Sequence, residues 1–169
     1  MNIIDAIIPE YQHEMAVTRK VLERVPDAHW AWKPHSKSMA MGALAAHLAE
    51  AQWWALGIMN DDVWVMDMAA YKPLVTASTA ETLVAFDKNV ADALAAMAGA
   101  SNEHMMKTWS MKTPDGHVMM AMPRIAVVRA FVLSHAIHHR GQLTVYLRMN
   151  DVALPQIYGP SADEPGMMG

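Results

Sequence analysis

The chain has 169 residues, of which 53% are hydrophobic and 18% are charged, so its composition argues against disorder and favours a substantial core. A formal net charge of −4 and the lack of any basic run disfavour a nucleic-acid partner. The absence of cysteine excludes disulfides, thiolate metal sites and cysteine nucleophiles, so any metal must be held by imidazole or oxygen. We expect one domain over residues 1–169.

The first segment, MNIIDAIIPEYQHE at residues 1–14, carries Asp5 inside a short apolar patch and lacks a basic start. It is therefore typical of the start of a helix rather than of a secretory signal. No apolar run in the sequence reaches the length of a membrane span. These features predict a cytoplasmic protein that does not bind a membrane.

Hydrophobic spacing predicts a first helix over residues 3–25, and Pro26 helps to end it. A polar and aromatic connector follows. The spacing then predicts a second helix over residues 38–59, one face of which carries Leu44, His47, Leu48, Ala51, Ala55 and Ile58.

A third helix is predicted to begin at Ser78, whose hydroxyl caps the first turn while Glu81 reaches back to it. The pattern continues to Gly99. In the next segment, KTWSMKTPDGHVMMAMP at residues 107–123, the turn residues 114–116 separate two short runs and favour a small hairpin.

A fourth helix is predicted from Pro123, which suits a first turn, to Met149. Asn150 suits the carboxyl-terminal cap because asparagine tolerates the left-handed conformation. The proline-rich tail over residues 151–169 is predicted to be a loop. Four amphipathic helices with modest connectors predict an all-α, four-helix bundle.

The stretch SHAIHHRGQL, residues 134–143, places three histidines within five positions. The spacing of His135 and His139 is weak evidence alone, since nine histidines placed at random give ~0.5 such pairs. On a helix the two lie about 40° apart, on the face that should look into the bundle. That face also carries Gln142, Phe131 and Tyr146.

His47 lies between apolar residues of the second helix, again on the face expected to be buried. Three inward histidines from two helices favour a metal site with an open position for water or substrate. The alternative is that each is a core histidine satisfied by a neighbouring carbonyl or carboxylate. Imidazole ligands suit zinc and nickel equally.

Two stretches, MGALAAHLAEAQWW (residues 41–54) and SHAIHHRGQLTVYLRMNDVALPQIYGPSADE (residues 134–164), resemble the DinB-like, or DinB/YfiT-like, superfamily of bacterial proteins. The resemblance covers nearly the whole chain. It implies an up-down-down-up bundle in which His47, His135 and His139 hold one divalent metal ion. Relatives include transferases and isomerases that use bacillithiol, mycothiol or glutathione.

These observations predict a metal-dependent enzyme of the thiol S-transferase or hydrolase type that acts on a small molecule, with a low-molecular-weight thiol as a second cofactor. The alternatives are a non-catalytic metal-binding or stress-response protein, and a helical dimer whose histidines bind nothing. Glu50, one turn beyond His47, is a candidate general base or a partner that orients an imidazole. Gln142 is a candidate substrate contact or a backbone partner.

Three further features carry weaker expectations. Arg140 lies about 140° from His135 around the helix, away from the core, where it would hold the tail or a partner subunit. The 17 methionines and six tryptophans are interpreted as core packing. A second apolar stripe opposite the histidines predicts a homodimer through that face of the fourth helix; it consists of Ala126, Ala130, Leu133 and Ile137.

Overall fold

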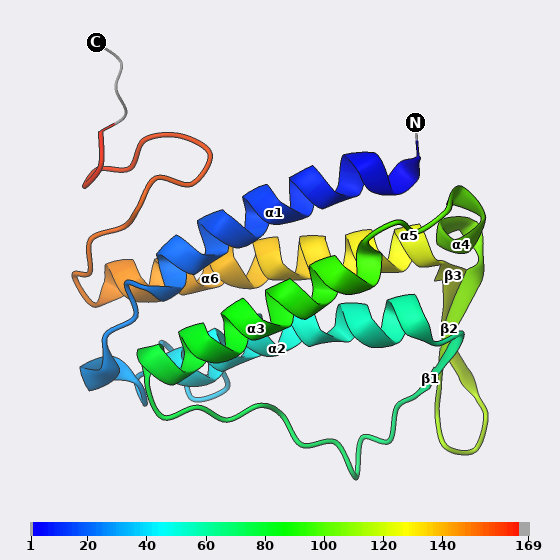
Figure 1. Ribbon diagram of the computed structural model, residues 1–169. Coiled ribbons are helices and arrows are strands. Elements are labelled where there is room, and N and C mark those ends of the chain that lie inside the picture. Colours follow the sequence, from blue (N-terminus) through cyan, green and yellow to red (C-terminus); the bar gives the residue numbers. More distant parts are fainter. Residues whose placement is uncertain (1, 166–169) are drawn as a thin grey trace.

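A computed structural model describes residues 2–165 and shows long helical segments lying side by side (Figure 1). The first three are α1 (Ile3–Leu22), α2 (Met41–Asn60) and α3 (Thr79–Met97). The fourth is continuous and comprises α5 (Arg124–Val127), the π-helical segment η2 (Val128–Ser134) and α6 (His135–Met149). Short helices η1 (Asp27–His29) and α4 (Asn102–Met106) lie in the connections.

The long helices run in two directions. Figure 1 shows α2 and α3 running one way and α1 and α6 running the other. Because α2 and α3 run the same way, the connection between them, residues 61–78, must return along the length of the molecule. That long connection carries several of the residues beside the functional site.

The prediction of a mostly helical fold is confirmed, but the all-α, four-helix class is too narrow. A three-stranded sheet lies at one end of the helices, with β1 (Val63–Val65), β2 (Thr108–Lys112) and β3 (Val118–Pro123) in that order. The predicted hairpin is present, since β2 and β3 pair antiparallel and Gly116 in their turn has a φ of 89°. Strand β1, which pairs parallel to β2, was missed because three residues are too few to show a period.

The helix ends differ slightly from the predicted ones. The first helix ends at Leu22 and not at residue 25, and the second begins at Met41 and not at residue 38. The predicted cap is present, because the Glu81 N–H donates to Ser78 Oγ at 3.2 Å. The Glu81 carboxylate, however, accepts from the Ala77 N–H at 2.8 Å, one residue earlier than predicted.

The fourth helix departs more from its prediction. Pro123 ends β3 and immediately precedes α5, so it is not part of the first helical turn. At the other end the left-handed residue is Asp151, with φ of 56°, and not Asn150, with φ of −112°. Residues 151–165 form no helix, as predicted, and the last four residues of the predicted tail lie outside the described part of the chain.

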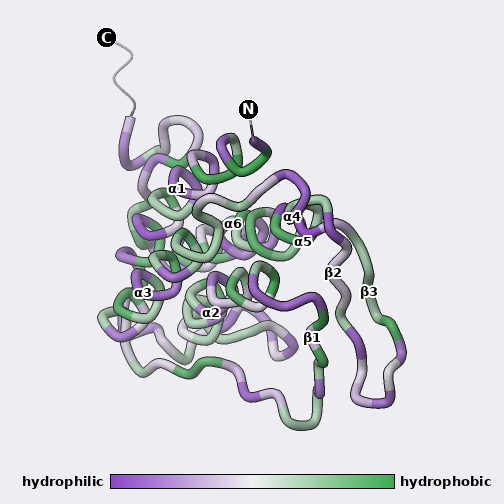
Figure 2. Tube along the Cα trace, turned by 45° about the vertical axis from the view of Figure 1, so that its right-hand side comes forward, coloured by the Kyte–Doolittle hydropathy of each residue, from purple (hydrophilic) through white to green (hydrophobic). Residues whose placement is uncertain are grey.

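Hydrophobic side chains of all four helical segments meet in one core, with Tyr11, Leu48, Ala93 and Leu143 fully buried. Figure 2 shows hydrophilic and hydrophobic residues alternating along the helices, whereas the tip of the β2–β3 hairpin is hydrophilic. No helix among residues 2–165 is long and apolar enough to span a membrane.

Arg140 lies on the side of α6 opposite the histidines, but that side is buried rather than facing away from the core. The guanidinium donates to the Glu14 carbonyl at 3.1 Å and to Thr18 Oγ1 at 3.2 Å, and it pairs with the Glu14 carboxylate at 2.8 Å. It also donates to the hydroxyl of Tyr158 in the tail. The predicted role in holding the tail is confirmed, and the expected exposure is wrong because α1 and the tail cover this side of α6.

The second apolar stripe of the fourth helix is partly covered by the chain itself. Leu133 is fully buried, Ala126 and Ile137 are half-buried, and Ala130 is exposed. Much of the apolar character that predicted a homodimer therefore serves the fold of one chain, and the homodimer stays a prediction.

Candidate metal centre

The three predicted ligand histidines come together between α2 and α6. His47 lies on α2, and His135 and His139 lie one turn apart on α6. One ring nitrogen of each lies within 4.8 Å of the others, and the Nε2 atoms of His47 and His135 are 2.8 Å apart. Among residues 2–165 this is the one group of three histidine, cysteine or acidic side chains with the spacing of a metal site. We call it the histidine triad.

The local backbone before the triad is unusual. The π-helical segment η2 ends at Ser134, directly before His135. Such segments are rare in proteins and are often found at functional sites. Because a π turn contains more residues than an α turn, the angle between Phe131 and His135 around the helix axis is not the one that α-helical spacing predicts.

Partial burial keeps the triad in its neutral form. Removal of water lowers the pKa of His47, His135 and His139 below the ordinary value for histidine. The pKa of His135 falls furthest, to about 4, because burial and the two other triad rings act together. At neutral pH all three imidazoles are therefore uncharged, which is the form that binds metal ions.

Glu50 lies behind His47, on the side away from the other two histidines. One carboxylate oxygen accepts from the Leu74 N–H at 3.2 Å, and the other, buried and without a hydrogen-bond partner, is 3.7 Å from His47 Nδ1. Burial and this carboxylate raise the pKa of Tyr71 to about 12. Since His47 turns Nε2 toward His135 and Nδ1 toward Glu50, the position of Glu50 favours the orienting role over that of a general base.

Gln142 does not face into the helices, so that expectation is wrong. Its side chain is exposed, and its Oε1 accepts from His139 Nδ1 at 2.7 Å. Because Nδ1 of His139 makes this contact, Nε2 is the nitrogen that remains free to face the space between the three histidines. The neighbouring His138 is exposed, with its ring centroid 4.9 Å from that of His139, and it is not part of the triad.

Trp54 is a site residue that the sequence analysis treated only as packing. Its indole is edge-on to the rings of His47 and His135, with centroid distances of 5.6 and 5.0 Å. The spacing of seven residues from His47, which places the two side chains only about 20° apart on α2, is the signal that could have identified it.

Two hollows flank the triad. One of about 290 Å³ includes His47 and Glu50 and extends to Trp30 and Thr76. The other, of about 170 Å³, has Trp54 in its wall and an entirely apolar lining. Both therefore share residues with the site.

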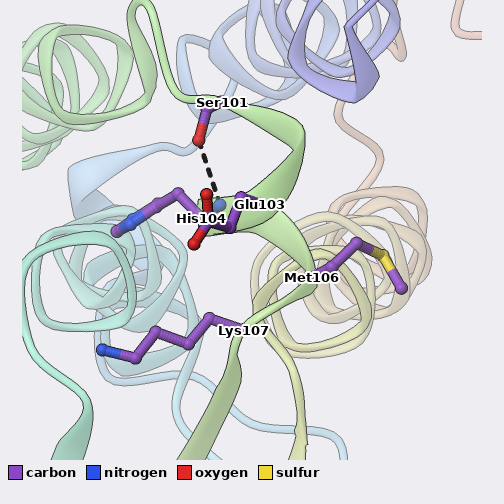
Figure 3. A pocket seen from close by; sticks show the side chains of 5 residues that line it. All are labelled: Ser101, Glu103, His104, Met106 and Lys107. Carbon is purple, nitrogen blue, oxygen red and sulfur yellow. Dashed lines mark hydrogen bonds between the residues drawn. The ribbon is translucent and has the colours of Figure 1, made fainter.

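The largest hollow, about 540 Å³, shares no residue with the triad. Figure 3 shows its lining around α4. Its histidine, His104, already pairs through Nε2 with the Met59 carbonyl at 2.9 Å, and Lys107 pairs with Asp62 at 2.6 Å. Both side chains therefore already have partners within the chain, and the size of this hollow alone does not make it a binding site.

Comparison with known proteins agrees with the fold. Residues 4–167 match the sequence profile of the DinB family. The chain belongs to the DinB family. YrdA of Bacillus subtilis strain 168, an uncharacterised protein, is 25% identical over 171 residues, which cover 98% of this chain and 94% of YrdA.

Two solved structures share the fold of this DinB-family chain at low sequence identity. A DinB-like protein from Bacillus cereus ATCC 10987 superposes with a TM-score of 0.71 at 18% identity, covering 91% of this chain and 97% of the other. The DinB-like protein YjoA from Bacillus subtilis gives 0.69 at 19% identity, covering 90% and 97%. At this level of identity the similarity supports the fold alone and says nothing about the chemistry of the site.

Proposed function

We propose that this DinB-family protein binds one divalent transition metal ion, zinc or nickel, through His47, His135 and His139. The observation that carries the proposal is the convergence of three neutral imidazoles from two helices, with Nε2 of His47 facing Nε2 of His135 at 2.8 Å. Imidazole nitrogens are suitable ligands for both metals. The carboxylate behind His47 and the amide oxygen beside His139 match the partners that usually orient ligand histidines.

We further propose that the protein is an enzyme, because three protein ligands are the number typical of catalytic rather than structural zinc sites. A metal ion held in this way supplies Lewis-acid chemistry and lowers the pKa of a water molecule or thiol that binds it. The residues of the chain hold and orient the ligands: Glu50 orients His47, Gln142 orients His139, and Trp54 limits access of water to one side.

Of the two reaction types, the site favours thiol transfer to a small-molecule electrophile over hydrolysis. Hydrolysis needs a base that faces the attacking water, and Glu50 lies on the far side of His47 from the shared space. A low-molecular-weight thiol brings its own nucleophilic sulfur; bound to the metal, it would release its proton to water, and its sulfur would replace the leaving group on the electrophile. The absence of a well-placed base is therefore less costly for thiol transfer.

A non-catalytic stress-response protein whose histidines hold no metal ion is the second candidate. It is supported by the 2.8 Å separation of the two Nε2 atoms, which is also a hydrogen-bond distance. Two imidazoles that share a proton satisfy each other and need no substrate.

The test uses protein without a histidine tag, stripped with a chelator and reloaded with zinc or nickel. The rate of conjugation of glutathione, bacillithiol or mycothiol to 1-chloro-2,4-dinitrobenzene is measured, with ester hydrolysis in parallel. We expect turnover that requires metal and is lost in His135→Ala, but retained in the matched control His138→Ala, which changes an exposed histidine outside the triad. Equal rates for the metal-loaded wild type, the stripped protein and His135→Ala would favour the non-catalytic candidate.

A further inference from the structure

The apolar hollow of about 170 Å³ beside the triad is built by distant parts of the chain. Its buried floor consists of Ile58 from α2, Trp109 from β2 and Val127 from α5. Trp54, Trp64 and Phe131 complete its aromatic walls. The small sheet thus supplies one side of a pocket whose other side is helical.

The pocket has the size and character of a site for one aromatic ring. Every side chain that lines it is apolar. An engineered protein cavity of about 150 Å³ with an apolar lining binds benzene. A hollow of about 170 Å³ therefore accommodates a group the size of a benzene ring.

Methionines form much of the remaining lining: Met66, Met68, Met111 and Met119. Met68 and Met119 are 69% and 49% exposed, whereas Met111 is 8% exposed. Flexible thioethers adapt their shape to a bound group and make favourable contacts with aromatic rings. Part of the high methionine content therefore has a more specific explanation than general packing.

The pocket and the triad are neighbours that share one side chain and one helical segment. The indole of Trp54 lines the pocket and also lies edge-on to His47 and His135. The π-helical segment η2 places Phe131 in the pocket wall and ends at the residue before His135. A group in the pocket is therefore one side chain away from two histidines of the triad.

We propose that this pocket binds an aryl group of the substrate, so that the reacting atoms attached to it extend past Trp54 to the triad. The substrate class is a small molecule that carries one benzene-sized ring. The second half of this proposal, the approach to the triad, rests on the proposed metal site, whereas the binding of the ring does not.

Ring binding is tested first on metal-free protein, by titration calorimetry with toluene. We expect saturable binding that is lost in Met66→Trp, where a half-buried side chain of the lining is replaced by one that fills the pocket. Met149→Trp, the same change at an exposed position on α6, is the matched control and should bind like the wild type. Should Met66→Trp fail to fold, Met119→Trp at the exposed rim replaces it. A lack of saturable binding, or binding that survives both filling variants, would overturn the proposal.

The approach to the triad is tested on zinc-loaded protein with acetohydroxamate and phenylacetohydroxamate, which differ by one ring. Burial of that ring should strengthen binding by roughly tenfold or more. Met66→Trp should remove this advantage, so that phenylacetohydroxamate binds no more tightly than acetohydroxamate. An equal affinity of the two hydroxamates contradicts the approach to the triad. If neither hydroxamate binds while toluene does, the metal site has failed and the ring pocket stands.

Discussion

Helix α6 carries two polar clusters on opposite sides, and they differ in how their groups are satisfied. Arg140 is buried against α1, where a carboxylate, a carbonyl and two hydroxyls surround its guanidinium. The three histidines of the triad, half-buried on the other side, face one another and leave ring nitrogens directed at a shared space. The chain completes the first cluster by itself, whereas the proposed metal ion would complete the second. The first therefore serves stability, and under the proposed function the second serves metal binding.

The largest expected effect separates these two roles. Arg140→Leu leaves the Glu14 carboxylate buried without its ion-pair partner, with only the Tyr158 hydroxyl donating to its side chain, and should lower the free energy of unfolding by about 3–5 kcal/mol. Urea unfolding measures the loss, and the metal content per folded chain should not change. The control is Arg129→Leu, which removes an exposed ion pair with Glu10 and should cost less than about 1 kcal/mol. Similar losses in the two variants would show that the Arg140 cluster is not a main source of stability.

Glu50→Gln tests whether the carboxylate behind His47 strengthens metal binding by the histidine triad. The amide can still accept from the Leu74 N–H but carries no charge to hold the His47 ring. Zinc affinity should fall roughly 10- to 100-fold, as is usual when a partner of a ligand histidine is lost. Competition with a fluorescent chelator measures the affinity. An unchanged zinc affinity would show that Glu50 does not orient His47 for metal binding.

The lowered pKa of His135 predicts a pH dependence of stability in the metal-free protein. The value is about 4 in the folded chain against 6.5 in the unfolded chain, so the unfolded chain binds more protons between these pH values. Stability is therefore fully present above pH 6.5 and is lost as the pH falls toward 4. Because the ring is partly exposed, the loss from this group should be about 1–2 kcal/mol. Urea unfolding at pH 7 and 4.5 should give a smaller difference for His135→Ala than for the wild type; an identical difference contradicts the prediction.

Gln142→Leu should give the smallest effect. It removes the acceptor of the His139 Nδ1 proton, but the side chain is exposed, so water replaces it. Zinc affinity should fall less than about tenfold, below the effect of Glu50→Gln. If Gln142→Leu lowers zinc affinity more than Glu50→Gln does, the prediction that the buried partner matters more than the exposed one is wrong.

The inward direction of each triad histidine could be predicted because it depends on local spacing within one helix. His135 and His139 are one helical turn apart, and His47 stands among apolar residues on an inward face, so periodicity alone gave the direction of all three. The same reasoning failed for Arg140 and Gln142. A helical wheel gives the direction of a side chain but not which element covers it, and α1 with the tail covers Arg140 while nothing buries Gln142.

The apolar pocket beside the triad is a feature that the sequence could not predict. Its walls bring together Trp64 of β1, Trp109 of β2 and Phe131 of the π-helical segment. Strand β1 is too short to show a period, and it pairs with a strand distant in the sequence. The π turn has no recognisable pattern of residues. Non-local pairing therefore determines the pocket, whereas local spacing determines the direction of each triad histidine and the packing of α2 against α6 brings them together.

Metal content measures the central claim most directly. Untagged protein, stripped and then titrated with zinc in a calorimeter, should bind one equivalent per chain, and His135→Ala should bind none under the same conditions. Failure of the wild type to bind an equivalent, or equal binding by His135→Ala, would contradict the assignment of the three histidines as a metal site.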